Sequence, residues 1–202
     1  MRKASAILYR FRGYILALFA VALIACPAAP FPQGKSISEF VPYIAALFLY
    51  AGGIALRVRA RQYIGQHTRG STHTADELVT DGPYAQCRHP LYTSNLFIAL
   101  GAASFHLGTS QLFVLFAPAL LLFEYALARA EDRFLEEKFG DTWSAWALRT
   151  PMVPSRVAIF TSKSDSAPRR TFLQAFKADA STWFWFVFFN LIIVLLKLHG
   201  LR

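Results

Sequence analysis

Residues 78–92 read Leu-Val-Thr-Asp-Gly-Pro-Tyr-Ala-Gln-Cys-Arg-His-Pro-Leu-Tyr, and this polar stretch lies between hydrophobic segments. Gly82 and Pro83 predict a turn, because glycine accepts a positive φ while proline fixes φ and lacks a backbone donor. Pro90 disfavours the α conformation at His89 and fits the first turn of a helix that follows. The stretch is therefore expected to be a loop that enters a membrane helix, with its polar and aromatic side chains close together.

The composition of the chain predicts an integral membrane protein. Of its 202 residues, 55% are hydrophobic and 19 are phenylalanine, and its mean hydropathy is +0.36, which is too apolar for an ordinary soluble domain. The formal net charge is +9, but the basic residues lie beside hydrophobic runs, so membrane lipids are expected as partners and nucleic acid is not. Cys26 and Cys87 are expected to be packing residues, because their positions suggest no disulfide framework.

Five apolar segments predict an all-α fold, a polytopic membrane protein with about five transmembrane helices. A spanning helix needs roughly 17 to 25 residues, and the segments cover residues 14–29, 40–56, 91–107, 112–128 and 182–198. The third and fourth are expected to pack as a hairpin, and residues 129–149 to continue the fourth as an amphipathic helix that Gly140 ends. The chain thus divides into a two-span region at 1–75, a core at 76–160, and a basic linker with the last span at 161–202.

The distribution of Lys and Arg predicts the orientation in the membrane. With the N-terminus inside, the inner segments hold 18 of the 21 basic residues, with 4 in residues 1–13, 5 in 57–90 and 9 in 129–181. Cytoplasmic loops carry an excess of Lys and Arg. We therefore expect the N-terminus and both polar blocks, 78–89 and 129–154, on the cytoplasmic face of a bacterial inner membrane.

Two ordered blocks of residues, separated by the predicted hairpin, carry a family resemblance. The first block is Gly82-Pro83-Tyr84, Arg88-His89-Pro90-x-Tyr92 and Gly101. The second is Glu131-Asp132, Leu135, Phe139-Gly140, Trp143, Trp146, Pro151 and Pro154. Together they resemble the isoprenylcysteine carboxyl methyltransferase and phospholipid methyltransferase family of integral membrane methyltransferases, over residues 76 to 154.

The resemblance implies an enzyme, an S-adenosylmethionine-dependent methyltransferase that acts on a hydrophobic or lipidic acceptor and binds its cofactor at the cytoplasmic face. It implies that the S-adenosyl-L-methionine pocket is lined by Glu77, Leu78, Val79, Tyr84, His89, Pro90, Leu91, Tyr92 and Glu131. These roles are chemically reasonable. A carboxylate such as Glu131 suits the α-amino group of the cofactor, and Tyr84 and Tyr92 offer π faces to adenine or to the sulfonium.

The candidate catalytic residues are His89, Arg88 and Arg129. Methyl transfer is an in-line displacement with a leaving group already activated by positive charge, so the protein mainly positions its substrates and excludes water. His89 is a candidate base where the acceptor is an amine or alcohol, and a carboxylate acceptor needs none. Family members that methylate isoprenylcysteine carry an arginine one turn before the glutamate, where this chain has Leu127, and Arg129 lies roughly 200° away around the helix at about 100° per residue.

Other interpretations stay open at this point. Membrane sterol and steroid reductases carry a similar Arg-His-Pro-x-Tyr block and bind NADPH, and interfacial anchors of a non-enzymatic membrane protein would use the same residue types. His67, His73, Cys87 and His89 lack a compact ligand spacing, so no metal is expected. Glu124 lies within the fourth span and is a further candidate, because a carboxylate inside a membrane is by default functional.

Overall fold

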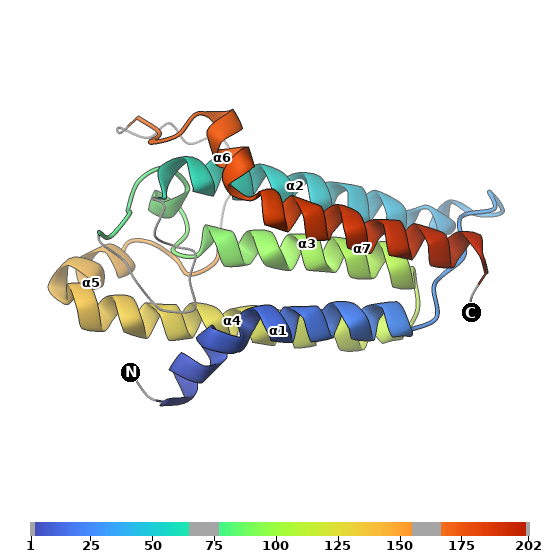
Figure 1. Cartoon of the computed structure of the whole chain (residues 1–202), viewed down its shortest axis with the longest axis horizontal. Coiled ribbons are helices and arrows are strands. Elements are labelled where there is room, and N and C mark those ends of the chain that lie inside the picture. Colours follow the sequence, from blue (N-terminus) through green and yellow to red (C-terminus); the bar gives the residue numbers. More distant parts are fainter. Residues whose placement is uncertain (1–2, 65–76, 155–166, 201–202) are drawn as a thin grey trace.

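The computed structural model describes residues 3–64, 77–154 and 167–200, and within these ranges it contains helices and no strand (Figure 1). The long helices are α1 (Lys3–Ala25), α2 (Val41–Tyr63), α3 (Pro90–Leu107), α4 (Leu112–Phe139) and α7 (Ala180–Leu198). The short ones are η1 (Ile37–Glu39), η3 (Gly82–Ala85), α5 (Asp141–Ala147) and α6 (Phe172–Ala178). The all-α prediction is confirmed.

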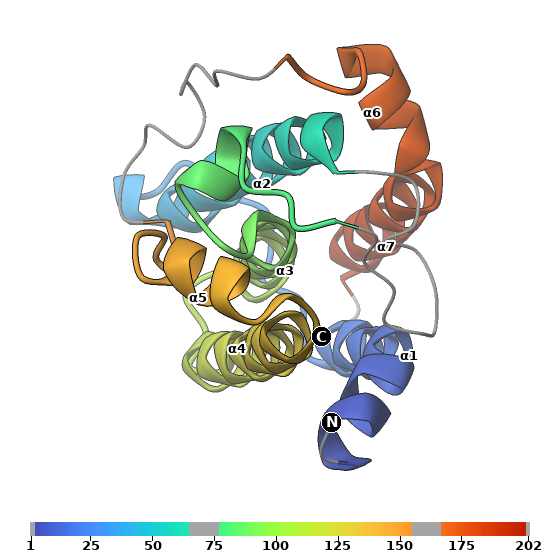
Figure 2. The same ribbon diagram turned by 90° about the vertical axis from the view of Figure 1, so that its left-hand side faces the viewer.

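Among the described residues, four helices are long and apolar enough to cross a membrane, over Ile7–Ala25, Ile37–Tyr63, Leu112–Phe139 and Ala180–Leu198. The remaining expected span, α3, has 18 residues and carries Thr93, Ser94 and Asn95 near its start. It packs against α2 and α4 and lies in the middle of the bundle (Figure 2). Protein rather than lipid surrounds it, so its polar side chains need not face hydrocarbon. The chain is an integral membrane protein of helices.

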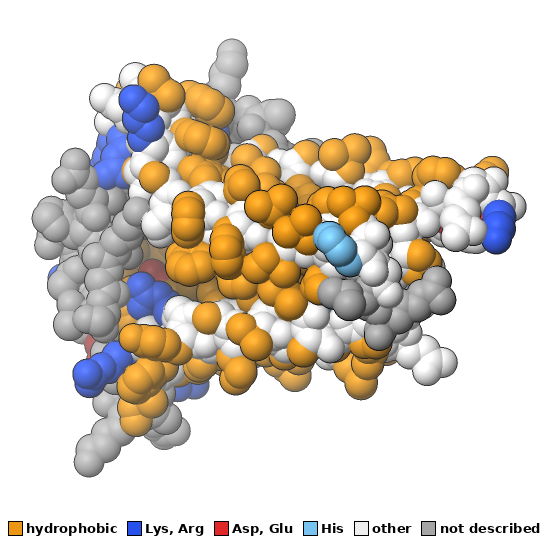
Figure 3. Space-filling model, turned by 45° about the vertical axis from the view of Figure 1, so that its right-hand side comes forward, with side chains coloured by type: hydrophobic (Ala, Val, Ile, Leu, Met, Phe, Trp, Pro, Cys, Tyr) orange, Lys and Arg blue, Asp and Glu red, His pale blue; other side chains and the backbone are white. Residues whose placement is uncertain are grey.

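Both polar blocks lie at the same end of the bundle. The C-terminal ends of α2 and α4 meet η3 and α5 there, and the N-terminus of α1 lies at this end too (Figure 1). Most of the Lys and Arg side chains visible in Figure 3 gather there, while apolar side chains cover the length of the helices. We call this the basic end. Its position on the cytoplasmic side of the membrane stays a prediction.

The hairpin of α3 and α4 is formed as predicted, and α4 ends at Gly140. On its other side α3 approaches α2 closely. A Cβ atom built on Gly53 would lie 2.8 Å from Ile98 Cγ1 and 3.1 Å from the Ser94 carbonyl oxygen. The first distance is shorter than real Cβ contacts and the second is tighter than most of them, so a side chain at position 53 would push α2 and α3 apart.

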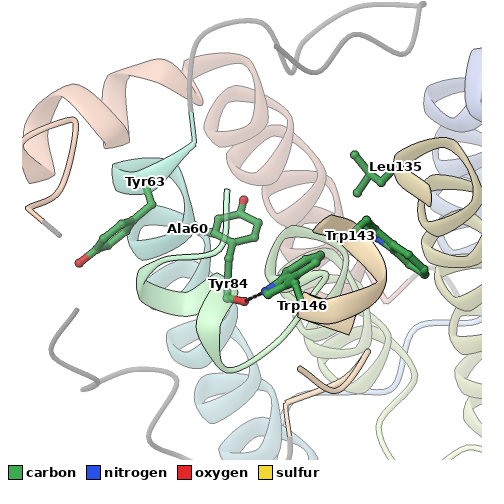
Figure 4. Packing of buried hydrophobic residues seen from close by; sticks show 6 residues of the cluster. All are labelled: Ala60, Tyr63, Tyr84, Leu135, Trp143 and Trp146. Atoms are coloured by element: carbon green, nitrogen blue, oxygen red, sulfur yellow. Dashed lines mark hydrogen bonds between the residues drawn. The ribbon is translucent and has the colours of Figure 1, made fainter. Parts of the chain in front are cut away.

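A buried cluster at the basic end holds the loop of residues 78–92 (Figure 4). Its members are Ala60, Tyr63, Tyr84, Leu135, Trp143 and Trp146. The Trp146 indole Nε1 donates to the Tyr84 carbonyl oxygen at 3.2 Å. Gly82 has a φ of +56°, and a Cβ atom on it would lie 2.5 Å from the Tyr63 ring. The turn predicted from Gly82 and Pro83 is therefore confirmed, and it is packed against α2.

The start of α7 is joined to α2 by buried ion pairs. Asp179, whose side chain is fully buried, accepts from Arg57 Nε and from Arg61 Nε, both at 2.9 Å. Arg57 Nη2 also donates to Thr182 Oγ1 at 3.1 Å. Two arginines one helical turn apart on α2 thus share one carboxylate that follows α6.

Further along, α7 has two more polar attachments. The Tyr50 hydroxyl of α2 donates to Asn190 Oδ1 at 2.7 Å near the middle of α7. Toward its C-terminal end, Lys197 Nζ donates to the Tyr43 hydroxyl at 3.2 Å and to the His106 carbonyl oxygen at 3.4 Å. Because the attachments lie at the start, middle and end, α7 keeps a fixed position in the bundle.

Candidate active site

A cavity of about 890 Å³ lies among the helices, with walls from α1, α2, α3, α4 and α7 and from the loop before α3. Small-molecule sites typically have volumes of roughly 300–1,000 Å³. The charged residues in its wall belong to the basic end and are Arg12, Arg57, Arg61, Glu77, Arg88, Glu131 and Arg169. The wall farther along the helices is apolar and includes Leu23, Ile98, Phe116, Leu120 and Ile193. The cavity therefore has a polar end and an apolar body.

All nine candidate cofactor residues lie in the wall of this one cavity. They are Glu77, Leu78, Val79, Tyr84, His89, Pro90, Leu91, Tyr92 and Glu131. Arg88 lines it as well. Two segments about 40 residues apart in the sequence, the loop entering α3 and the second half of α4, thus meet at the polar end. That they bind a cofactor stays a prediction.

A hydrogen bond joins the two blocks across this end of the cavity. The Tyr92 hydroxyl of α3 donates to Glu131 Oε2 of α4. The bond fixes one oxygen of the carboxylate, because an ionised carboxylate only accepts and has two oxygens for acceptance. Glu131 therefore presents an oriented negative charge inside the cavity.

Asp132 holds His89 in place. Asp132 Oδ1 lies 2.8 Å from His89 Nε2, and its Oδ2 lies 3.3 Å from Arg88 Nη2. Both His89 and Asp132 are buried. An ionised carboxylate only accepts, so His89 Nε2 carries the proton and, in the neutral ring, Nδ1 carries the lone pair. The structure thus sets the tautomer of the histidine that lines the cavity.

Arg129 is the one candidate catalytic residue that the structure does not bring into the cavity wall. Its side chain is 47% exposed, and its Nη1 lies 3.9 Å from Asp132 Oδ2. Leu127, fully buried, lines the cavity instead. Positions 127 and 129 lie roughly 200° apart around α4, so Arg129 faces outward when Leu127 faces the cavity.

The loop that carries Arg88 and His89 is also tied to the segment after α5. The Arg88 backbone N–H donates to the Pro151 carbonyl oxygen at 2.9 Å, and Cys87 Sγ donates to the Met152 carbonyl oxygen at 3.2 Å. Burial raises the pKa of the Cys87 thiol to about 11, which keeps this thiol protonated at neutral pH. Burial also raises the pKa of the Tyr84 phenol.

Sequence reasoning missed the cavity residues of α1, α2 and α7. Arg57 and Arg61 were counted only as basic residues beside a span, yet both line the cavity. Arg57 Nη1 donates to Asn95 Oδ1 of α3, and Glu124 of α4 is buried near the same two residues. The spacing of Arg57 and Arg61, one turn apart, was the available signal that both face the interior.

In the described part of the chain, no group of three or more His, Cys, Asp or Glu side chains has the geometry to hold a metal ion. His67 and His73, which were weighed as ligands, lie outside the described residues.

Comparison with known proteins identifies the family. The sequence pattern of the phospholipid methyltransferase family matches residues 41–142, half of the chain. The chain belongs to the phospholipid methyltransferase family. The resemblance seen in the two blocks is thereby confirmed, and the family match also takes in α2, which the blocks at residues 76 to 154 left out. Methyltransferases of the phospholipid methyltransferase family generally use S-adenosylmethionine.

The chain is also similar to two metal resistance proteins. The chain is 33% identical over 146 residues to the cobalt-zinc-cadmium resistance protein CzcN of Cupriavidus metallidurans, and 34% identical over 146 residues to the nickel-cobalt-cadmium resistance protein NccN of Alcaligenes xylosoxydans xylosoxydans. Each match covers 70% of this chain, but only 64% and 65% of the respective relatives. The chain therefore spans less than two thirds of the length of these proteins. No solved structure matches it.

Proposed function

We propose that this chain is an S-adenosylmethionine-dependent methyltransferase that acts on a hydrophobic or lipidic acceptor at the cytoplasmic membrane face. The observation that carries the proposal is the single cavity with two kinds of wall. Its polar end holds Glu131, Tyr92 and His89, and its apolar body is built from α1, α3, α4 and α7. In such a cavity a polar cofactor can lie against the polar end while an apolar acceptor lies in the apolar body, so the two can come into contact without burying unpaired polar groups.

The side chains at the polar end suit the proposed cofactor. Glu131, fixed by Tyr92, would accept from the α-amino group of the cofactor. Tyr84 and Tyr92 would contact the adenine or the sulfonium with their π faces. Residues 77–79 of the loop line the cavity with them. These chemical matches support S-adenosylmethionine as the cofactor.

When bound, the cofactor supplies a methyl group on a positively charged sulfur. The residues of this chain have the remaining tasks of orienting both substrates and keeping water out. His89 can take a proton on Nδ1 if the acceptor is an amine or an alcohol, since Asp132 holds Nε2 and stabilises the charged ring. Arg88 pairs with the same carboxylate, so it orients Asp132 and acts on the reaction through it.

Calorimetric binding of S-adenosylhomocysteine to the detergent-purified chain tests the proposal. We expect saturable binding by wild type and a loss of affinity of roughly 10- to 150-fold in Glu131→Gln, because a hydrogen bond to a charged group contributes about 1.5–3 kcal/mol. Glu136→Gln is the matched control, since Glu136 lies on the same helix and is exposed. Binding of NADPH in place of S-adenosylhomocysteine would favour the reductase, and binding of neither would favour a non-enzymatic protein.

A methylation assay then addresses the acceptor. Membrane lipid extract and labelled S-adenosylmethionine are incubated with wild type, with Glu131→Gln and with His89→Ala. We expect label in the organic phase with wild type and none with Glu131→Gln, whereas His89→Ala should lose the label only if the acceptor is an amine or an alcohol. The chemical stability of the labelled product to base separates an ester from an N-methyl group. If wild type binds S-adenosylhomocysteine but labels no lipid, an acceptor among the extracted lipids is excluded and the cofactor proposal stands.

The relatives suggest a physiological setting. Both are named for resistance to cobalt and cadmium, and we propose that methylation by this chain supports growth in these metals. A strain without the chain, complemented with wild type or with Glu131→Gln, tests this. Rescue by wild type alone supports the proposal, and equal rescue by both would exclude methylation as the source of resistance.

A further inference from the structure

The first half of α1 contributes to the polar end of the cavity, although it lies outside the family match at 41–142. The cavity residues of α1 recur every three or four positions and are Tyr9, Arg12, Gly13, Leu16, Ala17, Phe19, Ala20, Leu23 and Ile24. This spacing is one face of a helix. Because α1 enters at the basic end, Tyr9 and Arg12 are the members of that face nearest to the candidate cofactor residues.

Tyr9 and Arg12 are in direct contact. The Arg12 guanidinium lies 3.8 Å from the centre of the Tyr9 ring, and Arg12 Nη1 donates to the Tyr9 carbonyl oxygen at 2.9 Å. Tyr9 is only 8% exposed, on a helix whose spanning residues are otherwise mostly exposed. Stacking on a buried ring restricts the guanidinium to a small region at the cavity wall.

The pair is close to the block residues of α3 and α4. Arg12 and Glu131 both lie within electrostatic range of the Tyr9 and Tyr92 phenols. A cation from α1 and a carboxylate from α4 therefore lie around the same two tyrosines, at the end where Tyr92 donates to Glu131. Neighbouring opposite charges of this kind match a ligand that carries both an amine and a carboxylate.

We propose that Arg12 binds the α-carboxylate of the cofactor's amino-acid end, with Tyr9 positioning the guanidinium, so that α1 completes the cofactor site. The inference rests on the proposed function. The amine and the carboxylate of an α-amino acid are attached to one carbon atom, so if Glu131 binds the amine, the group that binds the carboxylate must lie a few ångströms from Glu131. Arg12 supplies that cation with the planar fork that matches a carboxylate.

The test compares S-adenosylmethionine with decarboxylated S-adenosylmethionine, because the two differ only in the carboxylate. Calorimetry on the full chain should show that wild type binds S-adenosylmethionine with roughly 10- to 150-fold higher affinity than the decarboxylated compound. This ratio corresponds to the free energy of one hydrogen bond to a charged group. In Arg12→Gln the preference should vanish, and in Glu131→Gln it should remain while both affinities fall. Arg10→Gln is the matched control, since Arg10 is exposed on the same helix, and it should keep the wild-type preference.

The outcomes separate this inference from the function on which it rests. If Arg12→Gln keeps the preference, or loses affinity equally for both ligands, Arg12 does not bind the carboxylate and the methyltransferase proposal stands. If wild type binds neither compound, the cofactor proposal fails and this inference fails with it. Arg12→Lys, with circular dichroism to confirm its helix content, guards against misfolding and should restore part of the preference, because it keeps the charge without the fork.

Discussion

Replacing Asp179 with alanine tests whether the ion pairs at the start of α7 hold this helix in the bundle. Asp179 is fully buried and accepts from Arg57 and Arg61, whose residues are 8% and 6% exposed. Removing one partner of a buried pair costs about 3–5 kcal/mol, because the other charge is left buried and uncompensated. Here two guanidiniums lose their shared carboxylate, so we expect about 5 kcal/mol, a large part of the roughly 5–15 kcal/mol that stabilises a domain.

The assay is unfolding of the purified chain in mixed micelles by increasing sodium dodecyl sulfate, followed by circular dichroism. Asp141→Ala is the control, since Asp141 is an exposed aspartate at a helix start, and it should cost no more than about 1 kcal/mol. The triple variant Asp179→Leu, Arg57→Met, Arg61→Met should recover most of the lost stability, because well-packed apolar residues can replace a buried ionic cluster at little cost.

Two results would refute the reasoning about Asp179. If Asp179→Ala is no less stable than Asp141→Ala, the ion pairs do not hold α7. If the triple variant is as unstable as Asp179→Ala, removing the two unpaired charges recovers nothing and the loss does not come from them.

Two other predictions concern the loop before α3. Gly82→Ala should destabilise the chain by roughly 2–4 kcal/mol, because Gly82 has a positive φ and because the added Cβ atom would meet the Tyr63 ring. Gly34 has a φ of +78° but open space around it, so in the same unfolding assay Gly34→Ala should lose only the stability that depends on the positive φ. Equal losses in the two variants would contradict the packing argument. Burial raises the pKa of the Cys87 thiol from 9.0 to about 11, so its contribution to stability is complete below pH 9 and is lost as the pH rises to 11. The stability difference between wild type and Cys87→Ala should therefore shrink by roughly 1 kcal/mol between pH 8 and pH 10, and a constant difference would contradict the burial of a protonated thiol.

Much of the candidate site could be predicted because it depends on local patterns and a short hairpin. Gly82, Pro83 and Pro90 specify the loop and the helix entry whatever the rest of the chain does. Two helices joined by a tight turn must run side by side, and each residue advances about 1.5 Å along its helix. Tyr92, near the start of α3, and Glu131, well along α4, therefore arrive at the same level of the bundle.

The rest could not be predicted because it depends on pairings across the whole chain. Arg57 and Asp179 are 122 residues apart. Several arginines beside a span give the same sequence pattern whether their side chains are solvated or form buried ion pairs. Helix α1 shows a similar ambiguity. Arg10 and Arg12 count equally as basic residues on the predicted cytoplasmic side. The orientation of α1 against α4 brings Arg12, and not Arg10, into the cavity wall.

The division of the cavity between helices has a consequence for acceptor choice. The residues proposed for the cofactor lie within the family match or in the first turns of α1, whereas much of the apolar body is built from the later turns of α1 and from α7, outside the match. An enzyme discriminates acceptors only through contacts that differ between them, so side chains that contact the cofactor alone cannot select the acceptor. Phe186 and Phe189 lie in the cavity wall of α7, between its attachments at Asp179 and Lys197. Since those attachments hold the helix at both ends, side chains between them can change in size and reshape the acceptor space while the cofactor end keeps its geometry.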